Sequence, residues 1–89
     1  LPISPEGGVR YNVPSFVRPS EMEENLTVRF RVGDVFKNKA IVVYFDDQLI
    51  SKKKRQVMAP GEMEQVILKK KKLEEYPETK KITIRIEEA

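Results

Sequence analysis

The stretch from Ala40 to Leu68, AIVVYFDDQLISKKKRQVMAPGEMEQVIL, decides the fold. Apolar residues on both faces of its first part, 40–45, are typical of a central β-strand. Asp46-Asp47 and Pro60-Gly61 are turn residues, and each pair is followed by another strand-like run. The sequence therefore predicts a meander of three consecutive strands. Its middle strand, Leu49 to Met58, is strongly cationic.

Further strands flank this meander. In 25–32 and 82–87 apolar side chains alternate with polar ones, as in a strand with one buried face. Lys37-Asn38-Lys39 is predicted to be a turn, and Leu73 and Tyr76 are the only expected anchors of a polar connector with room for one helical turn. We expect an all-β fold, a small immunoglobulin-like β-sandwich of six to seven strands. Its core is predicted from Leu26, Val28, Phe30, Ile41, Val43, Phe45, Ile82, Ile84 and Ile86.

The chain is expected to divide into two parts. Residues 1–19 hold four of the six prolines and the pair Gly7-Gly8, which predicts a Pro/Gly-rich lead-in segment with one short edge strand at Val9 to Val13. Residues 20–89 are predicted to form the sandwich. Because the chain begins at a leucine, we expect a piece of a longer protein.

Composition excludes several kinds of site. The chain has no cysteine and no histidine, which rules out a disulfide framework, a thiolate nucleophile and the commonest general base. No apolar run approaches the roughly 18 residues of a membrane span. No membrane partner is therefore expected, and the lack of cysteine favours a cytoplasmic setting. A net charge of +3 is too small to require a polyanionic partner.

Two clusters of positive charge are nevertheless candidates for a polyanion site. An independent nucleic-acid-binding module is the alternative function, and it would use phosphate contacts from both clusters. The simpler interpretation is an edge strand protected by lysine and a solvated loop, because no aromatic residues are interleaved with the lysines. The basic patch comprises Lys52, Lys53, Lys54, Arg55, Lys69, Lys70, Lys71 and Lys72.

Two pairs of carboxylates do not indicate a catalytic or metal site. Asp46-Asp47 is explained by a turn, and Glu62 with Glu64 by the polar face of a strand. Nothing in the sequence supplies a third ligand or a nucleophile beside either pair. Gly7-Gly8 lacks the preceding strand and following helix of a phosphate-binding loop. No catalytic, metal-binding or cofactor-binding residue is therefore expected in this chain.

Two blocks resemble a known family. PISPEGGVRY, from Pro2 to Tyr11, and VMAPGEMEQVIL, from Val57 to Leu68, resemble the C-terminal tail of FAD-dependent oxidoreductases of the pyridine nucleotide-disulfide type. The resemblance implies that FAD and NAD(P) belong to the parent enzyme, in glycine-rich dinucleotide-binding units that this sequence lacks. No cofactor residue of that family can be assigned to a position here.

The role that the resemblance implies is a non-catalytic C-terminal β domain. Such a domain would dock on the flavoprotein body, complete a homodimer or contact a partner subunit. Prolines and glycines let a backbone lie close to another surface, so the opening segment is the candidate contact. The candidate interaction residues are Pro5, Glu6, Gly7, Gly8, Arg10 and Tyr11.

Overall fold

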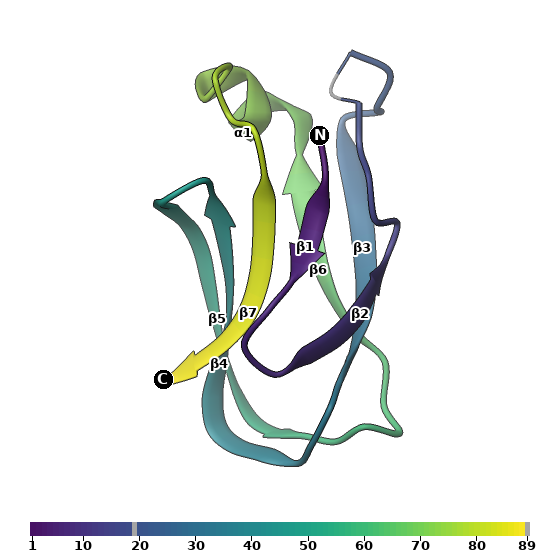
Figure 1. The fold of residues 1–89 in the computed structure, drawn as a ribbon, viewed down its shortest axis with the longest axis vertical. Coiled ribbons are helices and arrows are strands. Elements are labelled where there is room, and N and C mark those ends of the chain that lie inside the picture. The colour runs from purple at the N-terminus through teal and green to yellow at the C-terminus, as the bar shows by residue number, and fades with distance from the viewer. Residues whose placement is uncertain (19, 89) are drawn as a thin grey trace.

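The computed structural model describes residues 1–18 and 20–88, and it is a sandwich of two β-sheets (Figure 1). One sheet has four strands in the order β1-β7-β4-β5, and the other has three in the order β2-β3-β6. The prediction of a small all-β sandwich is confirmed. The strands are β1 (Ile3–Pro5), β2 (Val9–Val13), β3 (Asn25–Val32), β4 (Phe36–Phe45), β5 (Gln48–Met58), β6 (Glu64–Lys69) and β7 (Ile82–Glu88).

β4 is central, as its two apolar faces predict. It pairs antiparallel with β5 on one side and β7 on the other. Ala40 and Val42 are buried although they alternate with the side chains that face the core. The register places Val42 between Lys52 of β5 and Arg85 of β7. Long cationic side chains can cover apolar neighbours with their aliphatic stems while the charge stays in water. Lys52 and Arg85 are therefore placed to cover Val42 on the outer face.

The second half of the predicted meander is wrong. β5 forms a hairpin with β4, but β6 pairs antiparallel with β3 in the other sheet. The chain crosses between the sheets in the connection around Pro60-Gly61. β6 alternates buried and exposed residues along its whole length, which matches the alternation of β3 and directs both strands toward one core face. β5 and β6 consequently lie at the edges of different sheets.

The core lies between the two sheets. All the predicted core residues are buried except Leu26, which is half-buried and packs against the rest. Each fully buried aliphatic or aromatic side chain contributes roughly 1.5–3 kcal/mol. Other buried residues of the core are Ile3, Val9, Val17, Val32, Met58, Val66, Leu68 and Leu73.

The opening segment folds as part of the sandwich instead of leading into it. β1 pairs in parallel with β7, and β2 pairs antiparallel with β3. Gly7 and Gly8, both at positive φ, carry the chain from the first sheet to the second. The boundary predicted between 1–19 and 20–89 does not separate two structural units. Pro19 and Ala89, the last residues of those two spans, lie outside the described residues.

Lys37-Asn38-Lys39 does not form a turn, because β4 runs through all three residues. Asn38 has a φ of 54°, a left-handed conformation that asparagine adopts more readily than most residues. The strand therefore absorbs the irregularity as a local distortion and continues.

The polar connector contains the one short helix of the described residues, α1 (Lys70–Glu75). Leu73 is buried and Tyr76 packs edge-on against Phe45, with 5.9 Å between the ring centroids. The two predicted anchors of this connector are thus confirmed. Across residues 1–18 and 20–88, no helix has the length and apolarity that crossing a membrane requires.

Candidate functional site

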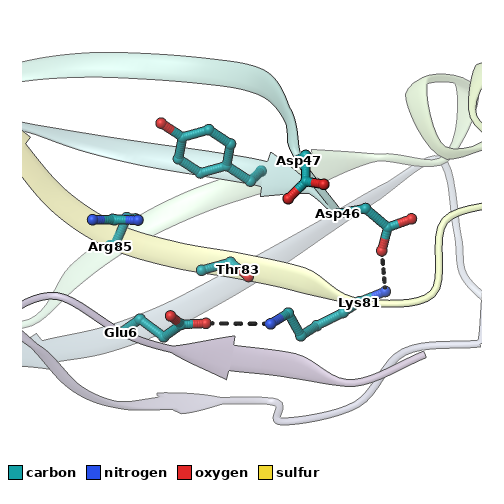
Figure 2. Close-up of a pocket in the computed structure, with 7 residues that line it drawn as sticks. Glu6, Asp46, Asp47, Lys81, Thr83 and Arg85 are labelled. Carbon is teal, nitrogen blue, oxygen red and sulfur yellow. Dashed lines mark hydrogen bonds and ion pairs between the residues drawn. The ribbon is translucent and has the colours of Figure 1, made fainter.

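A polar hollow of about 230 Å³ lies on the outer face of the four-stranded sheet, at the end where β4 turns into β5 (Figure 2). Asp46 accepts hydrogen bonds from the backbone N–H groups of Lys80 and Lys81, at 3.0–3.2 Å. These bonds tie the β4–β5 turn to the start of β7. Asp46 thus has a structural role in the turn, in agreement with its predicted role. The hollow is lined by Glu6, Tyr44, Asp46, Asp47, Lys81, Thr83 and Arg85.

Both cations of this hollow are paired with carboxylates, one in its lining and one beside it. Lys81 Nζ lies 3.5 Å from Glu6 Oε2, and Arg85 Nε lies 3.2 Å from Glu87 Oε2. The hydroxyl of Tyr44 donates a 2.7 Å hydrogen bond to Glu87, which raises the pKa of the phenol because this bond needs the proton. Within the described part of the chain, no three acidic residues are grouped to hold a metal ion. Lys81 and Arg85 of the hollow are thus engaged in ion pairs within the domain.

The structure places all six predicted interaction residues, Pro5 to Gly8 with Arg10 and Tyr11, in exposed positions. Their backbone is held by their own domain. Glu6 N donates to Ile84 O, and Gly7 O accepts from Ile86 N, both at 3.0 Å. A Cβ added to Gly8 would meet the Phe36 ring at 2.7 Å. The close approach that the glycines permit is therefore made within the domain. The side chains of Arg10 and Tyr11 stay available for contact.

Tyr11 belongs to a partly apolar surface on the outer face of the three-stranded sheet. The register places Tyr11 opposite Arg31 and Val13 opposite Arg29. The large side chains Tyr11, Val13 and Ile67 are exposed by 42%, 60% and 56%. We call Tyr11, Val13, Ile67, Arg29 and Arg31 the β2-β3-β6 face. Exposed aromatic and apolar residues with arginine are the composition enriched at protein interfaces.

The two basic clusters lie on different sheets. Lys52 and Lys54 pair with Val42 and Ala40, whereas Lys53 between them pairs with Ile41, whose side chain faces the core. Because strand side chains alternate, the run is split between two directions. Lys69 ends β6 and Lys70–Lys72 begin α1. One cluster is therefore carried by β5, and the other by the end of β6 and the start of α1.

The gap between β5 and β6 holds a groove of about 330 Å³ at the end nearer α1. Its floor includes Val43 and Phe45 of β4, and Lys69 and Lys72 stand at its rim. The lysines can be found from the sequence, whereas the groove cannot. The groove joins β4, β5, β6 and α1, whose proximity depends on the crossing between the sheets. We call it the β5–β6 groove. The remaining residues that line it are Ile50, Ser51, Ile67 and Leu68.

The prediction that Glu64 shares a polar strand face with Glu62 is wrong. Glu64 is only 2% exposed and accepts a 2.6 Å hydrogen bond from Arg55 Nη1, while Glu62 precedes β6. The inward direction of Glu64 could have been predicted from its spacing of two and four residues from Val66 and Leu68, the other buried residues of the same strand. An inward carboxylate requires a cation, and Arg55 reaches it from β5.

Comparison with known proteins gave no relative: no family model, no curated protein and no solved structure matches this chain.

Proposed function

We propose that this chain is a non-catalytic protein-interaction domain of immunoglobulin-like build, joined to the C-terminal side of an FAD- and NAD(P)-dependent oxidoreductase in the cytoplasm. The resemblance of Pro2–Tyr11 and Val57–Leu68 to the tail of that family supports the choice of parent enzyme. FAD and NAD(P) would bind the enzyme body, and this domain would dock on that body, on a homodimer mate or on a partner subunit.

The exposure of Tyr11 is the single observation that carries the docking role. This residue lies in the block that resembles the oxidoreductase tail, and its ring stands on the β2-β3-β6 face beside Arg31 and near Val13. Tyrosine and arginine are the residues most often responsible for binding energy at interfaces. The contact would thus extend from Pro5–Tyr11 onto the outer face of the three-stranded sheet.

The choice of parent is tested by sequencing the gene upstream of Leu1. We expect an open frame with glycine-rich strand–turn–helix units that bind dinucleotides. A frame without such a unit would overturn the assignment.

The docking role is tested by mixing residues 1–89 with the separately expressed enzyme body and measuring affinity by calorimetry. We expect Tyr11→Ala to weaken binding more than about tenfold, as an interface anchor does. Leu49→Ser is the matched control, because Leu49 is also exposed, by 52%, but lies in the β4–β5 hairpin. Equal effects of the two substitutions would contradict the proposed surface.

Polyanion binding by the basic patch is the alternative proposal. The exposure of Lys52, Lys53 and Lys54 favours it, but the alternation of their directions gives no continuous track for phosphates. Binding to nucleic acid that weakens steeply with salt is the expected sign of this function. A low-salt titration with no salt-sensitive binding removes it.

A further inference from the structure

The edge strands β5 and β6 leave a gap over one side of the core. β5 and β6 belong to different sheets and do not pair with each other. The Arg55–Glu64 ion pair joins them at one place along the gap. Toward α1 the gap opens into the β5–β6 groove, whose floor reaches Phe45 and Leu68 of the core. An apolar side chain of a partner can therefore reach the core surface at this end of the gap.

The charges at the groove all have the same sign. Among the residues of the described chain that line it, Lys69 and Lys72 are charged and none is acidic. Lys72 Nζ lies 3.4 Å from Glu75 on α1, with both side chains about half exposed. A surface pair of this kind contributes little stability, so a partner carboxylate can replace Glu75. The rim thus favours an anionic partner.

The backbone of β5 supplies a second element of recognition. This strand of 11 residues lies at the edge of its sheet, so alternate N–H and C=O groups along its outer side face away from β4. A free edge of this kind can bind an extended peptide as an additional strand. The groove and this edge are adjacent, because Ile50 and Ser51 of β5 form one wall of the groove.

We propose that the β5–β6 groove binds an extended acidic peptide segment of a partner protein. The peptide pairs with the free edge of β5, one of its apolar side chains enters the groove, and its carboxylates lie against Lys69 and Lys72. This site adjoins the β2-β3-β6 face at Ile67, and it does not depend on which enzyme the domain is joined to.

Two other occupants fit less well. A second copy of this chain would bring Lys52, Lys53 and Lys54 of each β5 edge against those of the other, and like charges in facing strands repel. Nucleic acid would find phosphate contacts at the lysines but no exposed aromatic ring in the groove for base stacking, because Phe45 is only 2% exposed. An acidic peptide satisfies both the charge and the apolar floor.

The experiment is a titration of isotope-labelled residues 1–89, followed by amide chemical shifts. The probe is a pool of blocked octapeptides in which glutamate alternates with leucine, isoleucine, valine or phenylalanine. A pool with serine at the apolar positions is the control. We expect shifts centred on Ile50, Ser51, Leu68 and Lys69 with the first pool, and binding at least about tenfold weaker with the second.

Variants separate the groove from general charge attraction. Lys69→Glu/Lys72→Glu should weaken binding at least about tenfold, whereas Lys37→Glu/Lys80→Glu makes the same charge change away from the groove and should have little effect. Ser51→Trp fills the groove from an exposed position, keeps every lysine, and should abolish binding.

Four results would overturn the proposal. These are no shifts at millimolar peptide, equal binding of the two pools, shifts centred on Tyr11 and Val13, and equal or tighter binding of a single-stranded oligonucleotide.

Discussion

Arg55 of β5 and Glu64 of β6 form a hydrogen-bonded ion pair between strands of different sheets, with 2.6 Å between Nη1 and Oε1. The Glu64 side chain is 2% exposed and the Arg55 side chain 35%. No backbone ladder joins these strands in the described structure. A side-chain ion pair therefore joins β5 to β6, whereas backbone hydrogen bonds join the neighbouring strands within each sheet.

Arg55→Ala should reduce the free energy of unfolding by about 2–3 kcal/mol, because it leaves a buried carboxylate without its cation. The value is below that of a fully buried pair because the guanidinium is partly solvated. Lys54→Ala, one residue away on β5, should change stability by less than about 0.5 kcal/mol. Urea denaturation of both variants measures the difference, and equal losses would show that the ion pair adds nothing specific.

Phe30→Ala should cost about 3–5 kcal/mol, because Phe30 is fully buried and its removal leaves a cavity between the sheets. Phe16 is 51% exposed, so Phe16→Ala should cost less than about 1 kcal/mol, including its contact with Arg18. Thermal unfolding followed by circular dichroism compares the two phenylalanines. A small effect of Phe30→Ala would contradict the position of the core.

Gly8→Ala should destabilise the domain by about 1–3 kcal/mol or more. Gly8 has a φ of +102°, and the added methyl group would lie 2.7 Å from Phe36 Cζ. Gly61 is the matched control, since a Cβ there meets nothing within 4 Å; Gly61→Ala should be neutral or stabilising by up to about 1 kcal/mol. Denaturant midpoints of the two variants test the crossing between β1 and β2, and similar midpoints would contradict it.

Tyr44 should lose its proton above the ordinary phenol pKa of 10.0, first because of its hydrogen bond to Glu87 and then because of burial and the charge of that carboxylate. The folded state then holds the proton more tightly than the unfolded state. The resulting stabilisation is complete below about pH 10 and declines as the pH rises through the folded pKa. An NMR titration of the ring should show the pKa falling in Glu87→Gln. An unchanged pKa in that variant would exclude the hydrogen bond as its cause.

The sequence predicts the strands better than their partners. Alternation of apolar and polar residues identifies β3 and β7, and apolar residues on both faces identify the central strand β4. Pro60-Gly61 is compatible both with a hairpin and with a crossing between sheets, so local turn chemistry could not assign β6 to its neighbour β3. Asn38 misled the prediction for a related reason, since a residue that favours turns can also sit in a distorted strand.

The candidate sites differ in the same way, since local residues are predictable and long-range contacts are not. Tyr11 and the lysine clusters are visible in the sequence, and the structure only places them. The β5–β6 groove and the Arg55–Glu64 pair depend on long-range contacts that follow from the sheet assignment of β6. Glu64 could be found from its phase with Val66, but its partner could not, because the two strands share no ladder.

The parallel pairing of β1 with β7 has a mechanical consequence. The two chain ends emerge toward opposite ends of the sandwich (Figure 1), and Pro2, Glu6 and Gly7 are bonded to β7 at Ile82, Ile84 and Ile86. Tension applied between Leu1 and Glu88 pulls these two strands past each other along their length. The hydrogen bonds between the two strands are then loaded together in shear and do not break one after another. A domain tethered at both ends in this way would resist extension before any of its core is exposed.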